Sequence, residues 1–435
     1  MFSRIMDLNY SIIGILRYYT KYVRSCFIKS EKMKAYQFQK LRKLLITAYE
    51  SIPFYREKYD QVGFNPKRDF KTLDDMKNVP ILSKQEARQA GNALKNPKYK
   101  WPTVNFTTSG TTGHPFRTFA SCRHWFVEQG LIYRHWKWAG YNFRDPVAII
   151  RSYGPREDEP LIKADKFRNF YYFSPFHLTD KNLSAYVEKM KHLKVKFVRG
   201  YPSTILMLAQ FMERHPELTI PTLEGAFVAS EVLSAKDREA IETSLSVSVF
   251  NHYGLAEQVV MFGDCEEHGG LHNYEEYGYL ELLEIKRSAH KRIIGTNLNN
   301  LAMPLIRYDT GDLAEVADEP CSCTRTSQSI NNVIGRVDQA IQCQHGCHVP
   351  MINMHTMIEP YDDHVAEWQL IQHSLSSLEL IVHTKDEVKL ENVSGRMMVD
   401  FCEPLPQEIK VKLSVNVPFQ QQSDGKKTIF VQNIH

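Results

Sequence analysis

The sequence predicts an α/β protein that ends in a small α+β domain. Between residues 147 and 250, short apolar runs bounded by turn residues alternate with helical segments, as expected for buried strands joined by crossover helices. After Arg307 the pattern changes to many short strand-like runs. Hydrophobic residues make up 43% of the chain and charged residues 24%, so a folded globular protein is expected.

The first long helix is predicted over residues 30–52. Leu41, Leu44, Leu45 and Ala48 recur at helical spacing there, and Pro53 ends the pattern. Two short helices separated by Pro80 are expected within residues 67–90, the second capped by Ser83.

The α/β part follows, and then the smaller domain. Strands are predicted at 147–150, 197–198, 226–229 and 247–250, and helices at 184–193 and 203–214. After Arg307, strands are predicted at 313–316, 340–342, 378–382 and 410–417, and a helix at 395–402. No internal repeat or low-complexity linker is present in the sequence.

Charge and cysteine content exclude several classes of protein. The 54 Lys and Arg residues against 50 Asp and Glu leave a net charge of +4 spread over the chain, which argues against nucleic-acid binding. No apolar stretch reaches the length of a membrane span, and Arg4 and Asp7 interrupt any signal-peptide pattern. We therefore expect a cytoplasmic protein, in which eight cysteines indicate free thiols or metal ligands.

The segment at residues 105–115, Asn-Phe-Thr-Thr-Ser-Gly-Thr-Thr-Gly-His-Pro, is typical of a phosphate-binding loop. Glycines permit close backbone approach, and consecutive N–H groups and hydroxyls can surround anionic oxygens. The segment lacks the Gly-Lys-Ser/Thr ending of a Walker loop, which disfavours a P-loop NTPase. A solvated surface turn is the alternative interpretation.

Three further motifs follow in order: His-Tyr-Gly-Leu-Ala-Glu at 252–257, Tyr-Asp-Thr-Gly-Asp at 308–312 and Ile-Gly-Arg-Val-Asp at 334–338. With the loop, they resemble the adenylate-forming superfamily of acyl-CoA synthetases. The resemblance is to its phenylacetate-CoA ligase-like family, and there to the CapK-like branch associated with capsular polysaccharide biosynthesis. Residues 52–56 and 79–84 are similar to the N-terminal signature of that family.

The resemblance implies a large N-terminal adenylation domain at residues 1–337 and a small mobile domain at 338–435, with Asp338 as the hinge. It implies ATP- and Mg²⁺-dependent activation of a small-molecule carboxylic acid to an acyl-adenylate, followed by transfer to a thiol, expected to be coenzyme A. Transfer to an amine or a carrier-protein thiol is one alternative, and a catalytically silent nucleotide-binding scaffold is another. A homodimer is compatible with the resemblance.

The same resemblance assigns the nucleotide site. The residues expected to hold the ATP phosphates are Thr108, Ser109, Gly110, Thr111, Thr112 and Gly113. The remaining residues expected on the nucleotide are Ser230, Glu231, Tyr253, Gly254, Asp312 and Arg336. Glu257 would place Mg²⁺, and the two oxygens of Asp312 would accept from the ribose hydroxyls. A core tyrosine is the alternative interpretation of Tyr253.

Catalysis and substrate binding involve further positions. Lys426 is similar to the family's C-terminal lysine, with Lys427 as the alternative, and Gly346 to the loop that lines the thiol tunnel. The expected substrate pocket includes Tyr153, Tyr201, Pro202 and Ser203. The chain departs from the superfamily pattern at Phe116, where many members carry lysine, and at 339–342, which lacks a second acid and a lysine.

Cysteine and histidine residues form a second constellation. Cys265 and His272 are followed about fifty residues later by Cys321 and Cys323, and the resemblance implies that these four hold a structural Zn²⁺, with His268 as the alternate histidine. Free thiols and surface histidines are the alternative. A second cluster, Cys343, His345, Cys347 and His348, falls on the predicted tunnel loop, where a rigid metal cage is disfavoured.

Overall fold

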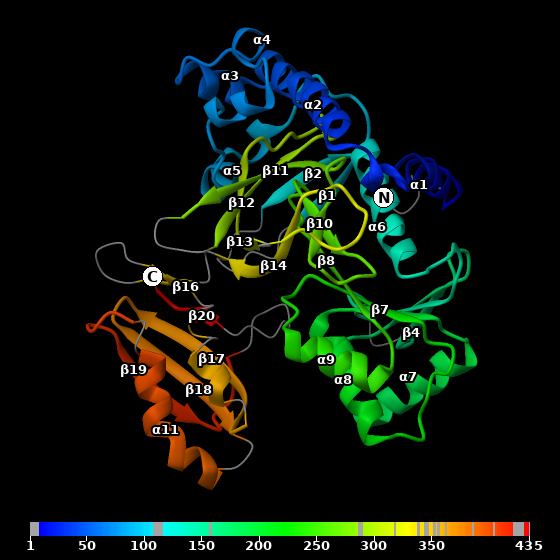
Figure 1. Cartoon of the computed structure of the whole chain (residues 1–435), viewed down its shortest axis with the longest axis vertical. Coiled ribbons are helices and arrows are strands. Elements are labelled where there is room, and N and C mark those ends of the chain that lie inside the picture. The colour runs from blue at the N-terminus through cyan, green and yellow to red at the C-terminus, as the bar shows by residue number, and fades with distance from the viewer. Residues whose placement is uncertain are drawn as a thin grey trace. The chain divides into compact units, whose positions relative to one another are not determined.

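The computed structural model divides into two compact units. The first comprises Met1–Thr310 and Ala314–Val333, and the second comprises Gly311–Leu313 and Ile334–His435 (Figure 1). The structure describes residues 8–107, 116–155, 159–285, 290–316, 319–336, 340–342, 348–350, 354, 357–361, 363–384, 387–402, 405–420 and 430–434. Within these residues, no helix is long and apolar enough to cross a membrane.

A helical segment opens the first unit. Its helices are α1 (Leu8–Tyr22), α2 (Ser30–Ser51), α3 (Pro53–Asp60), α4 (Pro66–Asp69) and α5 (Lys84–Ala90), with 3-10 turns at Ser25–Phe27, Leu73–Asn78 and Gly91–Leu94. Helix α2 matches the predicted first helix and buries Leu41, Leu44 and Leu45. Ser83 caps α5 as predicted, since its Oγ accepts from the Glu86 N–H at 3.1 Å.

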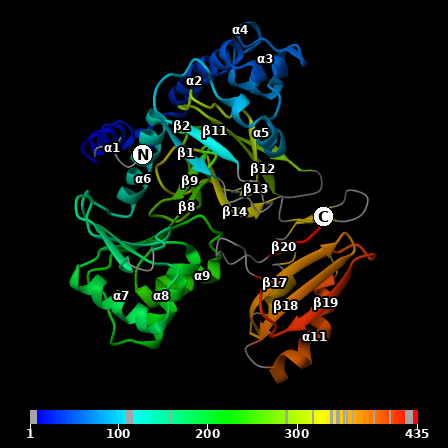
Figure 2. The same ribbon diagram turned by 180° about the vertical axis from the view of Figure 1, so that it is seen from behind.

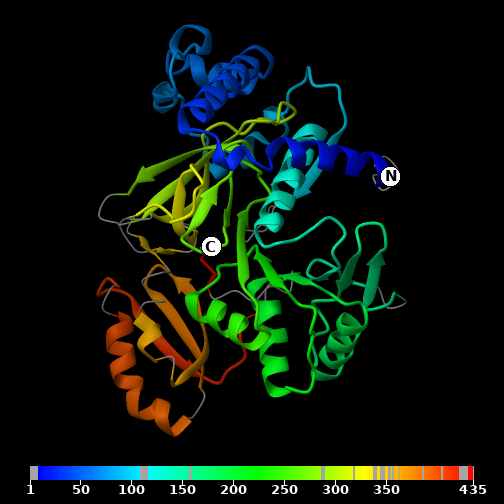
Figure 3. The same cartoon turned by 45° about the vertical axis from the view of Figure 1, so that its right-hand side comes forward.

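Helices α1 and α6 (Cys122–Trp138) pack closely together, and both are visible in Figure 3 as the dark blue and cyan helices. Gly130 allows this approach. A Cβ at that position would lie 2.8 Å from the backbone nitrogen of Tyr19, closer than carbon and nitrogen atoms normally come.

The largest sheet has twelve strands in the order β11-β12-β13-β14-β10-β9-β8-β7-β6-β3-β5-β4. Their bounds are β3 (Val147–Ile150), β4 (Ile162–Asp165), β5 (Phe170–Phe173), β6 (Phe197–Gly200), β7 (Gly225–Ala229), β8 (Val249–Gly254), β9 (Met261–Asp264), β10 (Leu271–Asn273), β11 (Gly278–Glu284), β12 (Lys291–Asn297), β13 (Tyr308–Val316) and β14 (Ser329–Arg336). The four strands predicted between residues 147 and 250 are β3, β6, β7 and β8, which lie side by side and parallel.

Both faces of these parallel strands are covered, which is why they appear in the sequence as continuous apolar runs. Helices α7 (Asp180–His192), α8 (Pro202–Arg214) and α9 (Ala235–Leu245) pack on the face that carries Ala148, Ile150 and Val198 (Figure 2). Helix α6 packs on the opposite face, where Trp136 stacks on Phe227 with ring centroids 4.9 Å apart.

Arg307 connects the helical segment to the sheet. It precedes β13 with a φ of 46°, in the left-handed region. Its buried guanidinium pairs with Glu281 of β11 at 2.8 Å and donates to the carbonyls of Lys77 and Val79. Backbone hydrogen bonds of about 3 Å join Leu82 to both Arg307 and Asp309. Side-chain and backbone contacts thus fix the start of β13.

The second unit has its own hydrophobic core. Its strands and helices are β15 (Ala340–Gln342), β16 (His348–Pro350), a 3-10 turn at Glu359–Tyr361, β17 (Val365–Ser374), β18 (Ser377–Thr384), α11 (Glu387–Cys402), β19 (Lys410–Val415) and β20 (Phe430–Gln432). A four-stranded sheet in the order β19-β18-β17-β20 packs against α11 through Leu370, Leu380 and Phe401. This α+β arrangement agrees with the expected class of the smaller domain.

The buried ion pair of Arg307 yields a stability prediction. Glu281→Gln should lower the free energy of unfolding of the first unit by about 3 kcal/mol, because it leaves a buried guanidinium without an anionic partner. On the same strand, the side chain of Glu284 is 75% exposed and pairs with Lys291, so Glu284→Gln should cost less than about 0.5 kcal/mol. Urea unfolding followed by tryptophan fluorescence measures both, and equal losses would contradict the anchoring role.

Candidate active site and metal-binding cluster

The predicted phosphate loop is carried by a hairpin. Strands β1 (Thr103–Thr107) and β2 (Arg117–Ser121) are antiparallel, with Thr107 opposite Arg117, so both ends of the loop are held side by side. The loop residues Thr108, Ser109, Gly110, Thr111, Thr112 and Gly113 lie outside the described residues, as do Asp338, Gly346 and Lys426. Their assigned roles stay predictions.

The base of the loop lies beside Glu257. The Thr118 hydroxyl of β2 donates to the carbonyl of Ala256 at 2.9 Å, in the turn that follows β8. Glu257 in this turn is buried, and its Oε1 accepts from the Tyr308 hydroxyl at 2.9 Å. A buried carboxylate oxygen held in this way is the kind of ligand that a hard cation such as Mg²⁺ prefers.

Several predicted residues meet at the carboxyl ends of the parallel strands. Glu231 follows β7, and its carboxylate accepts from the backbone N–H and the hydroxyl of Ser203 at 3.0 and 3.1 Å, at the start of α8. Neighbouring Ser230 has a φ of 76°. Pro202 is buried in the first turn of α8. The carboxyl edge of such a sheet is where α/β enzymes commonly bind ligands.

Aromatic residues line the same edge. The Tyr201 hydroxyl lies 3.2 Å from Ser152 Oγ, and the Tyr153 hydroxyl donates to the carbonyl of Pro160 at 2.6 Å. Tyr253, at the end of β8, packs at 5.5 Å from the ring of Phe262 and is followed by Gly254. The structure therefore brings the pocket residues and the adenine-side residues of the prediction to one edge of one sheet.

The strand motif at 308–312 forms the beginning of β13. Asp309 pairs with Arg292, and the Thr310 hydroxyl donates to the carbonyl of Ile293 at 2.8 Å. Gly311 has a φ of 74°, a conformation that favours glycine, and Asp312 follows it. Arg336 is the last residue of β14.

Charged residues that the sequence analysis did not assign lie on the face covered by α6. The pKa of Arg199 in β6 is lowered to about 9, mainly by burial and in addition by the nearby charge of Arg151. Burial raises the pKa of Glu128 to about 7, although hydrogen bonds from Tyr277 and Gln258 oppose this shift. One sequence pattern could have identified the two arginines: each lies at or just after an apolar run that forms a buried strand.

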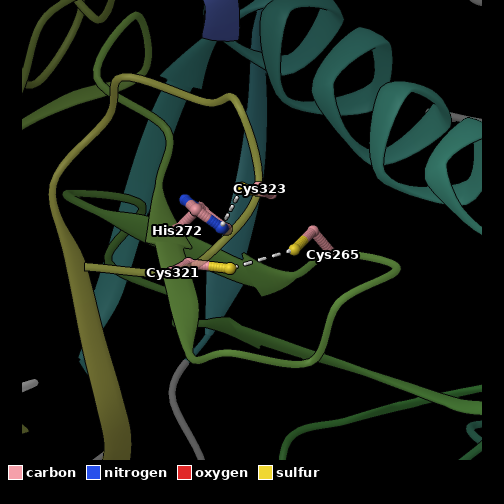
Figure 4. Close-up of side chains that lie close together, drawn as sticks. All are labelled: Cys265, His272, Cys321 and Cys323. Atoms are coloured by element: carbon pink, nitrogen blue, oxygen red, sulfur yellow. Dashed lines mark hydrogen bonds between the residues drawn. The ribbon is translucent and has the colours of Figure 1, made fainter. Parts of the chain in front are cut away.

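The cysteine and histidine cluster is drawn in Figure 4, and its ligand atoms all lie within 4.8 Å of one another. The four residues are Cys265, His272, Cys321 and Cys323. Cys265 Sγ lies 3.6 Å from Cys321 Sγ, and Cys323 Sγ lies 3.3 Å from His272 Nε2. Two sulfurs bound tetrahedrally at ~2.3 Å from Zn²⁺ would be about 3.8 Å apart, so the spacing fits.

The surroundings of the cluster orient His272. Ser327 Oγ lies 3.4 Å from His272 Nδ1, which leaves Nε2 facing Cys323. Burial lowers the pKa of His272 to about 4, so the ring is neutral near pH 7 and its nitrogen lone pair is available to a metal. The alternate histidine, His268, lies 3.4 Å from an oxygen of Asp264 instead and is not among the four.

Comparisons with known proteins find relatives in the family that the sequence motifs resemble. No family model matches the chain. A phenylacetate-coenzyme A ligase from Thermus thermophilus is 26% identical over 323 residues, covering 72% of each chain. Protein CapK from Staphylococcus aureus is 22% identical and covers 83% of this chain and 81% of its own length. A phenylacetate-coenzyme A ligase from Pseudomonas putida is 21% identical and covers 91% of each.

Solved structures share the fold. A 2-hydroxyisobutyryl-CoA ligase in its postadenylation state, bound to an acyl-AMP, superposes with a TM-score of 0.72 at 17% identity, covering 94% of this chain and 91% of that one. The same ligase with acyl-AMP and CoA in its thioesterification state gives 0.60 at 18% identity. The predicted resemblance is therefore confirmed: this chain is related in sequence to phenylacetate-CoA ligases and CapK and has the fold of acyl-CoA ligases of the adenylate-forming superfamily.

Proposed function

We propose that this protein is an AMP-forming acid-thiol ligase. A carboxylate oxygen of the substrate attacks the α-phosphorus of ATP, the bond to the β-phosphate breaks, and pyrophosphate leaves. A thiol sulfur then attacks the acyl carbon, loses its proton, and AMP departs. The observation that carries this proposal is the buried carboxylate of Glu257, held by Tyr308 beside the ends of the phosphate loop.

The first step needs stabilisation of charge as pyrophosphate departs. We assign loop residues 108–113 to the phosphates, Glu257 to Mg²⁺, and Lys426 to the substrate carboxylate and α-phosphate. Mg²⁺ would neutralise phosphate charge when bound. Asp312 and Arg336 are assigned to the nucleotide, as are Ser230, Glu231, Tyr253 and Gly254.

The second step requires access for a thiol. We propose the domain division at residues 337 and 338, with Asp338 as a hinge and Gly346 on the thiol tunnel, because adenylation and thioester formation need different surroundings for the same acyl group. The thiol is proposed to be that of coenzyme A. The need for ATP and coenzyme A agrees with a cytoplasmic location, and a homodimer remains a prediction.

The similarity to CapK favours a second candidate, in which the acyl-adenylate is delivered to an amine or to a carrier-protein thiol. The response of pyrophosphate release to different acyl acceptors separates the two candidate functions. Coenzyme A accelerates pyrophosphate release if it is the acceptor, whereas acceleration by hydroxylamine and not by coenzyme A indicates an amine or a carrier acceptor.

We also propose a structural Zn²⁺ in the Cys265, His272, Cys321 and Cys323 cluster. Its three sulfur donors and one nitrogen donor form a closed set typical of structural zinc. Bound metal would clamp residues 265–272 to residues 321–323.

The test of the proposed function is acid-dependent pyrophosphate release from Mg²⁺–ATP. Lys426→Ala should lower this release by at least about 100-fold with ATP affinity nearly unchanged, because its ammonium stabilises charge in the transition state only. Lys427→Ala is the matched control. If only Lys427→Ala loses pyrophosphate release, Lys427 has the catalytic role instead of Lys426. Full activity of both variants would contradict a catalytic lysine at either position.

Nucleotide binding offers a separate prediction. Asp312→Asn should weaken ATP binding about 10- to 100-fold in calorimetry, since hydrogen bonds to a charged acceptor contribute about 1.5–3 kcal/mol. Glu315→Gln, an exposed change on the same strand, should leave the affinity within twofold. Unchanged affinity in Asp312→Asn would count against a ribose contact.

Metal analysis tests the zinc proposal. The purified protein should contain about one Zn²⁺ per chain, and Cys265→Ser should remove it and lower the melting temperature of the first unit. Cys122→Ser is the control, because Cys122 lies outside the cluster and its hydrogen bond to the carbonyl of Pro102 suits a serine. A stable wild-type protein with no metal would overturn the proposal.

A further inference from the structure

Two arginine side chains and one buried histidine share one face of the parallel strands. Arg199 of β6 lies opposite Ile149 of β3, and His252 of β8 lies opposite Ala229 of β7. Arg151 follows β3 and continues the alternation of Val147 and Ile149, whose side chains face α6. We call Arg151, Arg199 and His252 the cationic cluster.

The two arginines differ from the other inward-facing arginines of the first unit. Arg134 pairs with Glu276 at 2.8 Å, Arg307 pairs with Glu281, and Arg238 pairs with Asp264. By contrast, among the described residues neither Arg151 nor Arg199 forms an ion pair with a carboxylate. A guanidinium withdrawn from water is normally paired, so this exception requires an explanation.

Among the described residues, aromatic rings and a hydroxyl contact the two arginines directly, while the charges of Glu231 and Glu128 act on Arg151 and Arg199 without forming an ion pair. Arg199 lies over the Trp136 ring at 5.0 Å from the centroid. Arg151 lies 5.1 Å over the Tyr201 ring and donates to Ser230 Oγ at 3.2 Å. Aromatic faces and a hydroxyl stabilise a cation only weakly compared with a carboxylate.

The nearby acids are engaged elsewhere. The Glu128 carboxylate accepts hydrogen bonds from Tyr277 and Gln258, and the Glu231 carboxylate accepts from Ser203. His252 Nε2 is buried and has no hydrogen-bond partner among the residues that the structure describes. Among the described residues, the cationic cluster therefore combines two guanidinium groups that form no ion pair with a buried histidine nitrogen that has no hydrogen-bond partner.

The cluster lies at the edge where the acid is proposed to bind. Tyr201, a predicted pocket residue, contacts Arg151 directly, and Ser230 is on the predicted nucleotide side. His252 precedes Glu257 by five residues, across the turn at the end of β8. An anion bound by the arginines would thus lie at the sheet edge where the acid is proposed to bind.

We propose that the acid activated by this enzyme carries a second anionic group, a carboxylate or a phosphate, which Arg151 and Arg199 bind while the first carboxylate reacts with ATP. This inference rests on the proposed function and names its substrate class. The planar guanidinium fork matches both oxyanions, and partial burial strengthens the interaction relative to water.

A matched panel of acids tests the proposal on the unmodified protein. Pyrophosphate release is measured with aliphatic dicarboxylic acids of four to six carbons, with the half-amide of each, and with the methyl-terminated acid of equal length. Phosphonate-terminated acids form a further arm that separates phosphate from carboxylate recognition. We expect kcat/KM for the best dianionic acid to exceed that of its half-amide by at least about tenfold.

Variants then assign the selectivity to the cluster. Arg199→Met and Arg151→Met should each raise KM for the dianionic acid at least about tenfold while changing KM for ATP less than twofold, and Arg199→Lys should recover part of the loss. Arg214→Met is the matched control, because the Arg214 side chain is exposed on α8 and pairs with Asp180. If KM for ATP rises equally, the arginines bind the nucleotide and the inference is overturned. Should the methionine variants fail to fold, the wild-type panel still decides.

The outcomes separate this inference from the proposed function. Release with methyl-terminated or aromatic monocarboxylic acids, at rates above those of the dianionic acids, overturns the inference and leaves the ligase proposal standing. If none of the acids triggers pyrophosphate release and calorimetry detects no ATP binding, the ligase proposal is overturned and the inference with it. ATP binding without release from any dianionic acid overturns the inference alone.

Discussion

The hydrogen bond from Tyr308 to Glu257 holds together the parts of the first unit on which the proposed chemistry depends. It joins the first residue of β13 to the turn after β8, across 51 positions of sequence. Tyr308 can fill this role because Arg307, just before it, is fixed by the Glu281 carboxylate and by two carbonyls of the helical segment. A buried carboxylate held by a neutral donor keeps oxygen free for a cation.

The distribution of charge distinguishes structural arginines from functional ones. Arg134, Arg238 and Arg307 each have a carboxylate partner, as the cost of desolvating a guanidinium requires. Arg151 and Arg199 are held by aromatic rings and a hydroxyl at the carboxyl edge of the parallel strands. An enzyme that must bind an anion has to leave such charges unpaired in its free state, and the surrounding fold supplies the stability that this costs.

The cysteine and histidine cluster addresses a different requirement. Residues 265–272 contribute β10 and the turn before it, while Cys321 and Cys323 belong to an irregular segment between β13 and β14. A metal ion bound by the three thiols and the imidazole would hold the segment that carries Cys321 and Cys323 to the sheet, as structural metal sites do in segments with little core of their own.

The sequence by itself determined the local elements, the order of the motifs and the resemblance. The spacing of Leu41, Leu44 and Leu45 defines α2, and the apolar runs at β3, β6, β7 and β8 identify strands buried on both faces, since these patterns depend on neighbours a few residues apart. The resemblance also predicted the four cysteine and histidine residues that lie together, with His268 left open as the alternate histidine. Only the tertiary structure decided which histidine faces the thiols, which hydroxyl holds Glu257, and which arginines pair with a carboxylate. Each of these depends on pairing between residues tens to hundreds of positions apart, and no local pattern in a chain records whether a distant partner is present.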